Sequence, residues 1–222
     1  MRPIVILWCT IRPTLFNSTH KFWIDNAKSS DRITTYVCGF QSDLDLTSGT
    51  NLIKIPTVAK GLTKACSYLT STISKLEFKD NPIFIFASDD FFPPKYWDDI
   101  LEHEFNDYDG SIVFYDGTDG NNPIVAIPIL TYNTLKLLNF IIYHPAYTHL
   151  YCDNELYFNL DQLNKLKDYR KTNQSIFFEH RHWSFGKRPI DQQDVVNSSK
   201  AYVDERLWQI RSQYSLEDRL TI

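Results

Sequence analysis

The hydrophobic pattern of the first 90 residues alternates between two periods. Three short runs, 3–9, 33–40 and 82–87, are apolar almost throughout, which predicts buried strands. Between them, apolar residues recur every three or four positions, which predicts helices near Asn17, from Thr57 and from Pro94. Strands that alternate with helices are typical of a mostly parallel sheet with helices on both faces. The sequence therefore predicts an α/β fold.

The helix that Thr57 caps has the longest apolar stripe of the chain. Its inward positions are Val58, Leu62, Ala65, Leu69, Ile73 and Leu76. After residue 110 the pattern is less regular, with predicted strands at 111–115, 124–130 and 175–178 and predicted helices at 131–140, 153–166 and 203–213. Because Pro128 cannot donate to a ladder, we expect the 124–130 strand at an edge or a bulge. Since no repeat or linker composition is present, we expect one domain.

Composition limits the classes of function. The chain has 222 residues, 43% of them hydrophobic, and a formal net charge of -4, which argues against a sequence-blind nucleic-acid or anionic-membrane binder. No apolar run is long enough to cross a bilayer, and no leader pattern is present. The four cysteines form no C-x-x-C pair, which favours reduced thiols. We expect a soluble cytoplasmic protein without a membrane span.

The seven glycines form neither a G-x-G-x-x-G nor a G-x-x-x-x-G-K-S/T motif. A nucleotide would therefore need a metal or basic side chains to hold its phosphates. The strand pattern indicates where it would bind, because the carboxyl ends of parallel strands meet at one edge of the sheet. The segments that follow the three strands, 10–13, 41–43 and 88–90, should line one cleft.

Asp89 and Asp90 are the most informative pair in that cleft. Adjacent carboxylates after a buried strand repel each other unless a cation or a proton compensates them. Mg²⁺ or Mn²⁺ would do so, because these ions are usually held by one or two carboxylates together with substrate phosphates. Capping of the helix at Pro94 explains the pair equally well.

Other candidate residues lie further along the chain. His180 and His182 point the same way if their segment is extended, so both could join a mixed nitrogen and oxygen site for Mn²⁺, although a surface pair is the simpler interpretation. Asp153 and Glu155 begin a predicted helix, where at most one can face the cleft as a general base. Asp116 could bind a substrate hydroxyl or shape a turn. Basic residues at 187–188 could neutralise a diphosphate.

The ordered set of motifs resembles the nucleotide-sugar glycosyltransferases of the GT-A fold, close to glycosyltransferase family 2 and including viral or phage-type members, whose compartment would be the host cytoplasm. The segment 83–94 with Trp97 resembles the family's strand and D-x-D-type motif. The segment 11–14 resembles its first nucleotide loop, 115–156 its acceptor half, and 179–183 the late histidine segment. The likeness runs in order over residues 3–190.

The resemblance implies a division of the single domain. Residues 1–110 would form the nucleotide-sugar-binding half, 111–190 the acceptor half and 191–222 a C-terminal helical segment. The implied metal ligands are Asp90, His180 and His182, and the implied base is Asp153 or Glu155. The implied acceptor-binding residues are Asp116 and Trp183. The implied nucleotide-sugar-binding residues are Thr10, Arg12, Asp43, Gly61, Ser88, Asp89 and Lys187.

The resemblance further implies an inverting transfer from a nucleotide-diphosphate sugar, a UDP-sugar first, with Mn²⁺ or Mg²⁺ as cofactor. The family's Glu-Asp pair at the base position is replaced by Asp153-Asn154-Glu155, and we expect Asp153 to be the base. The acceptor is expected to be a glycan or a lipid-linked sugar. Alternatives are a hydroxymethylated DNA base as acceptor, a GT-A-like nucleotidyltransferase, and an inactive carbohydrate-binding protein that kept the fold.

Overall fold

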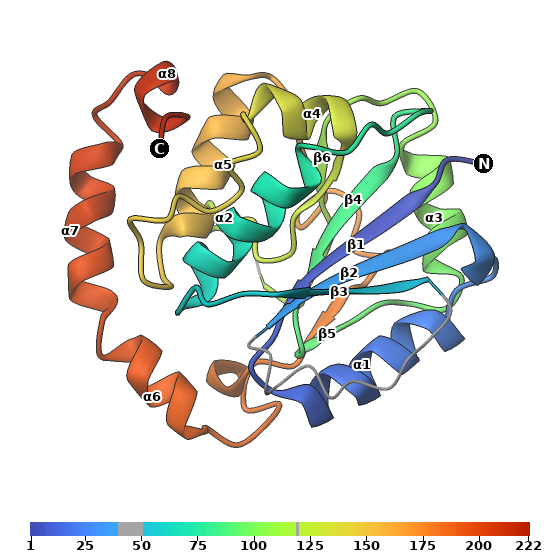
Figure 1. Ribbon diagram of the computed structural model, residues 1–222, viewed down its shortest axis with the longest axis horizontal. Coiled ribbons are helices and arrows are strands. Elements are labelled where there is room, and N and C mark those ends of the chain that lie inside the picture. The colour runs from blue at the N-terminus through green and yellow to red at the C-terminus, as the bar shows by residue number, and fades with distance from the viewer. Residues whose placement is uncertain (40–50, 119) are drawn as a thin grey trace.

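The computed structural model describes residues 1–39, 51–118 and 120–222 of the chain (Figure 1). The described strands form a seven-stranded sheet in the order β3-β2-β1-β4-β7-β6-β8. Its strands are β1 (Ile4–Cys9), β2 (Ile33–Gly39), β3 (Leu52–Pro56), β4 (Ile83–Ala87), β6 (Ser111–Val113), β7 (Ile129–Thr131) and β8 (Leu166–Asp168). All neighbouring strands are parallel except β7, which is antiparallel to β4 and β6. A two-stranded antiparallel sheet joins β5 (Phe91–Phe92) to β9 (Glu179–His180).

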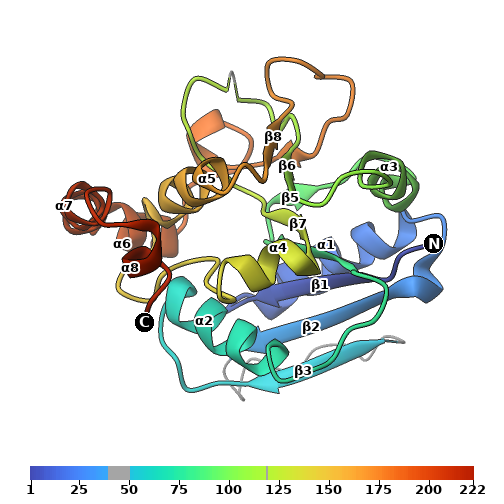
Figure 2. The ribbon, with the colours of Figure 1, turned by 90° about the horizontal axis from the view of Figure 1, so that it is seen from above.

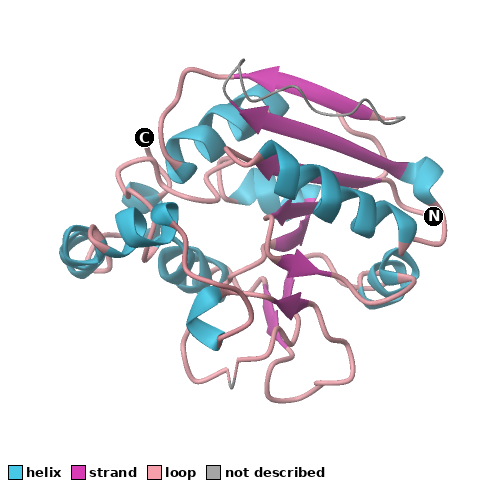
Figure 3. Ribbon diagram, turned by 90° about the horizontal axis from the view of Figure 1, so that it is seen from below, coloured by secondary structure: helices cyan, strands magenta, loops and turns pink. Residues whose placement is uncertain are grey.

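The helices cover both faces of the large sheet (Figures 2 and 3). They are α1 (Pro13–Asp25), α2 (Leu62–Ile73), α3 (Trp97–Glu104), α4 (Tyr132–Leu137), α5 (Cys152–Gln162), α6 (Gln192–Ser198), α7 (Ala201–Arg211) and α8 (Leu216–Arg219), with short 3₁₀ turns at Ser30–Arg32 and Trp183–Phe185. Successive side chains of a strand face opposite ways, and β1 divides accordingly. Ile6 and Trp8 pack in a core with α1 and α3, whereas Val5 and Leu7 pack in a second core with α2, α4 and α5. The predicted α/β fold is confirmed.

The C-terminal helices form an arc along one side of the molecule (Figure 1). Helix α7 is attached to α5 by Arg211, whose guanidinium binds Glu155. At the other end of α7, Asp204 accepts hydrogen bonds from the backbone of residues 148–150. This attachment places α6 beside the loop that follows β1, where Arg12 pairs with Asp191. No described helix is both long and apolar enough to span a membrane.

Several predicted boundaries are wrong. Helix α2 begins at Leu62 and not at Thr57, because Gly61 adopts a φ of 94° and turns the chain; Val58, expected in the stripe, is 93% exposed. Within 124–130 only the last two residues belong to β7, which ends at residue 131 and lies between β4 and β6 rather than at an edge. Pro128 directly precedes that strand, where its carbonyl accepts a hydrogen bond from the N–H of Phe86 at 2.9 Å.

The last predicted strand is also shifted along the chain. Residues 175–178 contribute one isolated bridge, between Phe177 and Tyr115, and the ladder forms at Glu179–His180. The elements that the pattern did not predict are β3, β5, β8, α6 and α8.

Candidate active site

The carboxyl ends of β1 and β4 meet as expected, and their side chains bind each other. The indole N–H of Trp8 donates to Oδ1 of Asp89 at 2.9 Å, and the Thr10 hydroxyl lies 3.3 Å from Oδ2. Burial raises the pKa of Asp89 to about 6, although both of these hydrogen bonds and the charge of Arg12 oppose that rise. The 10–13 and 88–90 segments therefore line one edge, while Asp43 lies outside the described residues.

Asp90 has different surroundings from its neighbour. The Ser88 hydroxyl donates to Oδ1 of Asp90 at 2.6 Å, and Nε2 of His180 lies 3.5 Å from Oδ2. Burial alone would raise the pKa of this carboxyl, but the contacts with His180 and Ser88 hold it well below its usual range. Of the two carboxylates, Asp90 is thus the one held as an anion beside an imidazole.

The small β5–β9 sheet explains how His180 reaches this position. Its ladder pairs Phe91 with His180, whose rings stack with centroids 4.0 Å apart, and the N–H of Arg181 donates to the carbonyl of Asp90 at 2.7 Å. The His182 ring lies 5.1 Å from that of His180, and its Nδ1 is 2.7 Å from the Ser184 hydroxyl. The rings of His180 and His182 therefore lie close together, as expected for residues two apart in an extended segment.

Asp90 and His180 have side chains of the types that bind a divalent metal when substrate phosphates supply its remaining ligands. Among the described residues, no group of three or more His, Cys, Asp and Glu side chains could hold an ion unaided. Oδ2 of Asp90 and Nε2 of His180 lie 3.5 Å apart, and they supply one oxygen and one nitrogen of the types that bind Mn²⁺. Mg²⁺ and Mn²⁺ are commonly bound by so few protein ligands when phosphates supply the rest.

Asp153 and Glu155 have separate environments. Asp153 lies in the first turn of α5, and burial of its carboxyl raises the pKa to about 6, against the lowering effect of the backbone N–H groups of Asp153 and Asn154 and the charge of His180. A carboxyl with this pKa can accept a proton near neutral pH. The charge of His180 thus acts on the Asp153 carboxyl.

Glu155 points into the protein interior. It is 3% exposed, its two oxygens each lie 2.8 Å from the Arg211 guanidinium, and it accepts the Tyr147 hydroxyl at 2.8 Å. Such a buried pair, hydrogen-bonded on both oxygens, holds α7 on α5. The geometry therefore favours Asp153 over Glu155 as a base, because residues two apart on a helix face different ways.

Asp116 shapes a turn and supports β9. Its Oδ1 accepts hydrogen bonds from the N–H of Thr118 at 3.0 Å and from the Thr118 hydroxyl at 2.6 Å, as in an Asx turn. Its carbonyl accepts the N–H of His180 at 3.2 Å. Asp116 is buried, whereas the predicted acceptor residue Trp183 is half-buried beside the His182 ring, with centroids 5.4 Å apart.

Of the predicted basic spot, Arg188 rather than Lys187 reaches the site. Arg188 Nη2 lies 3.9 Å from Oδ2 of Asp90, while Lys187 is exposed. Gly61 takes part differently from the prediction: it precedes α2 and lies against the loop at Thr148, with a built Cβ 3.7 Å from that carbonyl. No described contact joins Gly61 to Asp89 or Asp90.

Sequence reasoning missed four residues of this region. They are Trp8, His149, Asp191 and Asp194. His149 is half-buried, and the charges of Asp90, Arg12 and Asp194 all reach its ring. The contacts of Trp8, His149 and Asp191 join segments far apart along the chain, so no spacing in the sequence could have indicated them, whereas Asp194 pairs with Arg188 six residues before it. Position after a strand, the signal that identified Thr10 and Asp89, applies to none of them.

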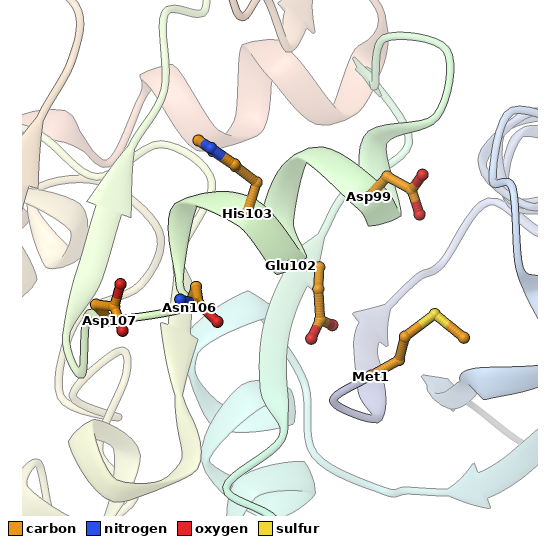
Figure 4. Close-up of a pocket in the computed structure, with 6 residues that line it drawn as sticks. All are labelled: Met1, Asp99, Glu102, His103, Asn106 and Asp107. Carbon is orange, nitrogen blue, oxygen red and sulfur yellow. The ribbon is translucent and has the colours of Figure 1, made fainter.

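Two surface hollows accompany this arrangement. One, of about 380 Å³, lies between the loop after β1 and α6 and is lined by Ile11, Arg12, Asp191, Gln192 and Val196. The other, of about 540 Å³, lies at the amino end of β1, against α3 (Figure 4). The first lies at the carboxyl end of β1, where Arg12 follows Thr10, and Asp89 and Asp90 are not among the residues that line either hollow.

Comparison with solved structures identifies the fold. The mannosyltransferase PcManGT from Pyrobaculum calidifontis, in complex with GDP-Man and Mn²⁺, is similar over 99% of this chain and 68% of its own, with a TM-score of 0.60 and 12% identity. TarS from S. aureus in complex with UDP is similar over 98% of this chain and 77% of its own, with a TM-score of 0.58 and 9% identity. The chain has the GT-A fold. No protein-family profile matches the sequence, and neither does any curated protein.

Proposed function

We propose that this protein is a metal-dependent, inverting glycosyltransferase that moves a sugar from a nucleotide-diphosphate donor, a UDP-sugar first, to an acceptor hydroxyl. The observation that carries the proposal is the pair formed by Asp90 and His180, 3.5 Å apart at the carboxyl end of β4. A ligand is expected at that edge in an open α/β sheet. The GT-A fold and the ligands named with its structural neighbours, GDP-Man, UDP and Mn²⁺, agree with it.

The donor would lie over the loops that follow β1 and β4. Asp90 and His180, with His182 beside them, would hold Mn²⁺ or Mg²⁺ on the donor diphosphate. When bound, the metal supplies positive charge that stabilises the leaving phosphate. Asp89 would keep its hydrogen bonds to Trp8 and Thr10 and so stabilise the conformation of the 88–90 loop. The nucleotide-binding half would be residues 1–110.

Asp153 would act as the general base. Its carboxylate takes the proton of the acceptor hydroxyl while that oxygen attacks the anomeric carbon, and the bond from that carbon to the phosphate oxygen breaks with its electrons passing to the diphosphate. One displacement of this kind inverts the configuration. The acceptor half, 111–190, would present Asp116 and Trp183 near the acceptor, and 191–222 would close the site from the side.

The acceptor is proposed to be a glycan or a lipid-linked sugar, and a hydroxymethylated DNA base is the alternative. The net charge of -4 favours the former, because DNA binding relies on basic surface. The test is a panel of UDP-, GDP- and dTDP-sugars, each with and without Mn²⁺. The wild-type protein is compared with Asp90→Asn, which should lose the metal-dependent activity. We expect hydrolysis or transfer from one donor with metal only. If no donor is bound or turned over with any metal, the proposal is refuted.

A further inference from the structure

Two arginines at the site are paired with carboxylates of the chain itself. Arg12 Nη2 lies 2.6 Å from Oδ2 of Asp191. The two terminal nitrogens of Arg188 lie 2.6 and 2.8 Å from the two oxygens of Asp194, in a bidentate pair. The same Arg188 lies 3.9 Å from Asp90, so these pairs border the metal-binding carboxylate. We use the term strap for residues 191–194, the segment that carries these carboxylates.

The strap is locally well built. Asp191 caps α6, and its side chain and that of Asp194 form a reciprocal capping box. The contact with Arg188 lowers the pKa of Asp194 to about 2, so both partners are charged at neutral pH. The strap also forms one wall of the 380 Å³ hollow beside Arg12. Figure 1 shows α6 at the end of the sheet where α1 begins.

The charges of the region are unfavourable for a donor while the strap is in place. Asp89, Asp90, Asp191 and Asp194 supply carboxylates, and their described arginine partners are Arg12 and Arg188. A nucleoside diphosphate that entered would add negative charge beside four acidic side chains. Guanidinium groups bind phosphate with the same bidentate geometry that they use for carboxylate, so the donor and the strap compete for the same two cations.

We propose that the strap is a self-inhibitory segment, in which Asp191 and Asp194 occupy Arg12 and Arg188 in place of the donor's diphosphate. The inference rests on the proposed function and adds its regulation. Binding of a nucleoside diphosphate transfers both arginines from the strap to the phosphates and releases α6 from the loop after β1. Of the two pairs, Arg12–Asp191 is the more exposed and so is the easier to break, whereas Asp194 of the second pair is buried.

The test measures binding of UDP, GDP and inorganic pyrophosphate, each with Mn²⁺, by titration calorimetry at fixed ionic strength. The variant is Asp191→Asn with Asp194→Asn, which keeps side chains that cap a helix well. Its matched control is Asp25→Asn, which removes one charge from an exposed pair with Lys21 at the end of α1. We expect the double variant to bind the diphosphates about tenfold more tightly, which corresponds to one charge-assisted contact. Uridine, which has no phosphate, should show no gain.

The outcomes separate the strap from the proposed function. Equal or weaker diphosphate binding by the double variant, with binding by the wild type, overturns the strap and leaves the transferase proposal standing. Absence of nucleoside diphosphate binding in every form overturns both. Hydrogen exchange of the amides of residues 191–200 in the wild-type protein gives a second readout. Faster exchange on addition of UDP and Mn²⁺ is expected, and slower exchange would mean that the segment closes over the donor instead.

Discussion

The indole N–H of Trp8 donates to Oδ1 of Asp89 at 2.9 Å, across the two central strands of the sheet. Trp8 is buried under α1, so this contact links the carboxyl end of β4 to the core. A buried carboxylate needs such donors, because removing one leaves a desolvated charge without its partner. We therefore expect Trp8 to hold the position of Asp89.

Trp8→Phe should lower the free energy of unfolding by about 1.5–3 kcal/mol, the range for a hydrogen bond to a charged group. It should also weaken Mn²⁺-dependent nucleotide binding, because Asp89 shapes the loop beside Asp90. Trp97→Phe is the matched control, since the Trp97 indole donates to the carbonyl of Trp23 at 2.8 Å in the same core. Denaturant unfolding and nucleotide titration of both variants check this. A binding loss of the same size in Trp97→Phe would contradict the positioning role.

Asp153→Asn and Glu155→Gln should fail in different ways. Asp153→Asn should keep the fold and nucleotide binding and stop transfer, because the base is lost. Glu155→Gln leaves the Arg211 charge buried without its partner and should cost about 3–5 kcal/mol of stability. Donor turnover, nucleotide titration and denaturant unfolding separate the two. Transfer by Asp153→Asn at the wild-type rate would move the base elsewhere.

The pH dependence of transfer should reflect Asp153. Burial raises its pKa from 3.8 to about 6 in the folded protein, so the carboxylate that takes the proton is formed only as pH rises through about 6. The rate of transfer should therefore rise with pH around that value. A rate that is flat between pH 5 and pH 7 would be inconsistent with Asp153 as the base.

The raised pKa of Asp153 also makes a prediction about stability. A raised folded pKa means that the Asp153 carboxyl keeps its proton to a higher pH in the folded state than in the unfolded state. The contribution of Asp153 to stability is therefore fully present below about pH 4 and is lost as pH rises through about 6. The loss for this group is about 3 kcal/mol, because each tenfold change in proton affinity is worth about 1.4 kcal/mol. Asp153→Asn removes this titrating group and its pH-dependent loss of stability. The stability of the variant relative to wild type should therefore increase by about 3 kcal/mol between pH 4 and pH 7. Unfolding curves at four pH values measure it.

The sheet and the polar segments at the carboxyl ends of β1 and β4 could be predicted because they depend on local pattern. Ile4–Cys9 and Ile83–Ala87 are buried along their length apart from Cys9, so their apolar runs are continuous, and the polar residues that follow them lie at one edge by topology. Strand β3 could not be predicted in the same way. It lies at the edge of the sheet, and only Ile55 of its five residues is buried.

The long-range contacts of the site could not be predicted from the sequence pattern. Asp89 and Asp90 form one acidic pair in the sequence, yet the fold gives them opposite pKa shifts through burial and through His180. Glu155 and Arg211 are 56 residues apart, and nothing in their spacing indicates an ion pair. The His180–His182 spacing was informative only because β9 is extended and pairs with β5.

Asp204 should be essential for the position of the C-terminal helices. Its carboxylate is buried and accepts the N–H groups of Thr148, His149 and Leu150 at 2.8–2.9 Å, together with the Thr148 hydroxyl at 2.7 Å. Asp204→Ala leaves these donors without an acceptor and should cost about 2–4 kcal/mol. Denaturant unfolding measures the loss. An effect below about 0.5 kcal/mol, the usual size for a surface change, would contradict the attachment.

Metal-dependent nucleotide binding at Asp90 and His180 is tested most directly by calorimetric titration. UDP and GDP are titrated, with and without Mn²⁺, into the wild-type protein and into Asp90→Asn. We expect the wild-type protein to bind one of these nucleotides tightly only with Mn²⁺. In Asp90→Asn, whose fold should be intact by circular dichroism, the metal-dependent part of the affinity should disappear. Metal-dependent binding of equal strength in both proteins would contradict the assignment of Asp90 and His180 as the donor site.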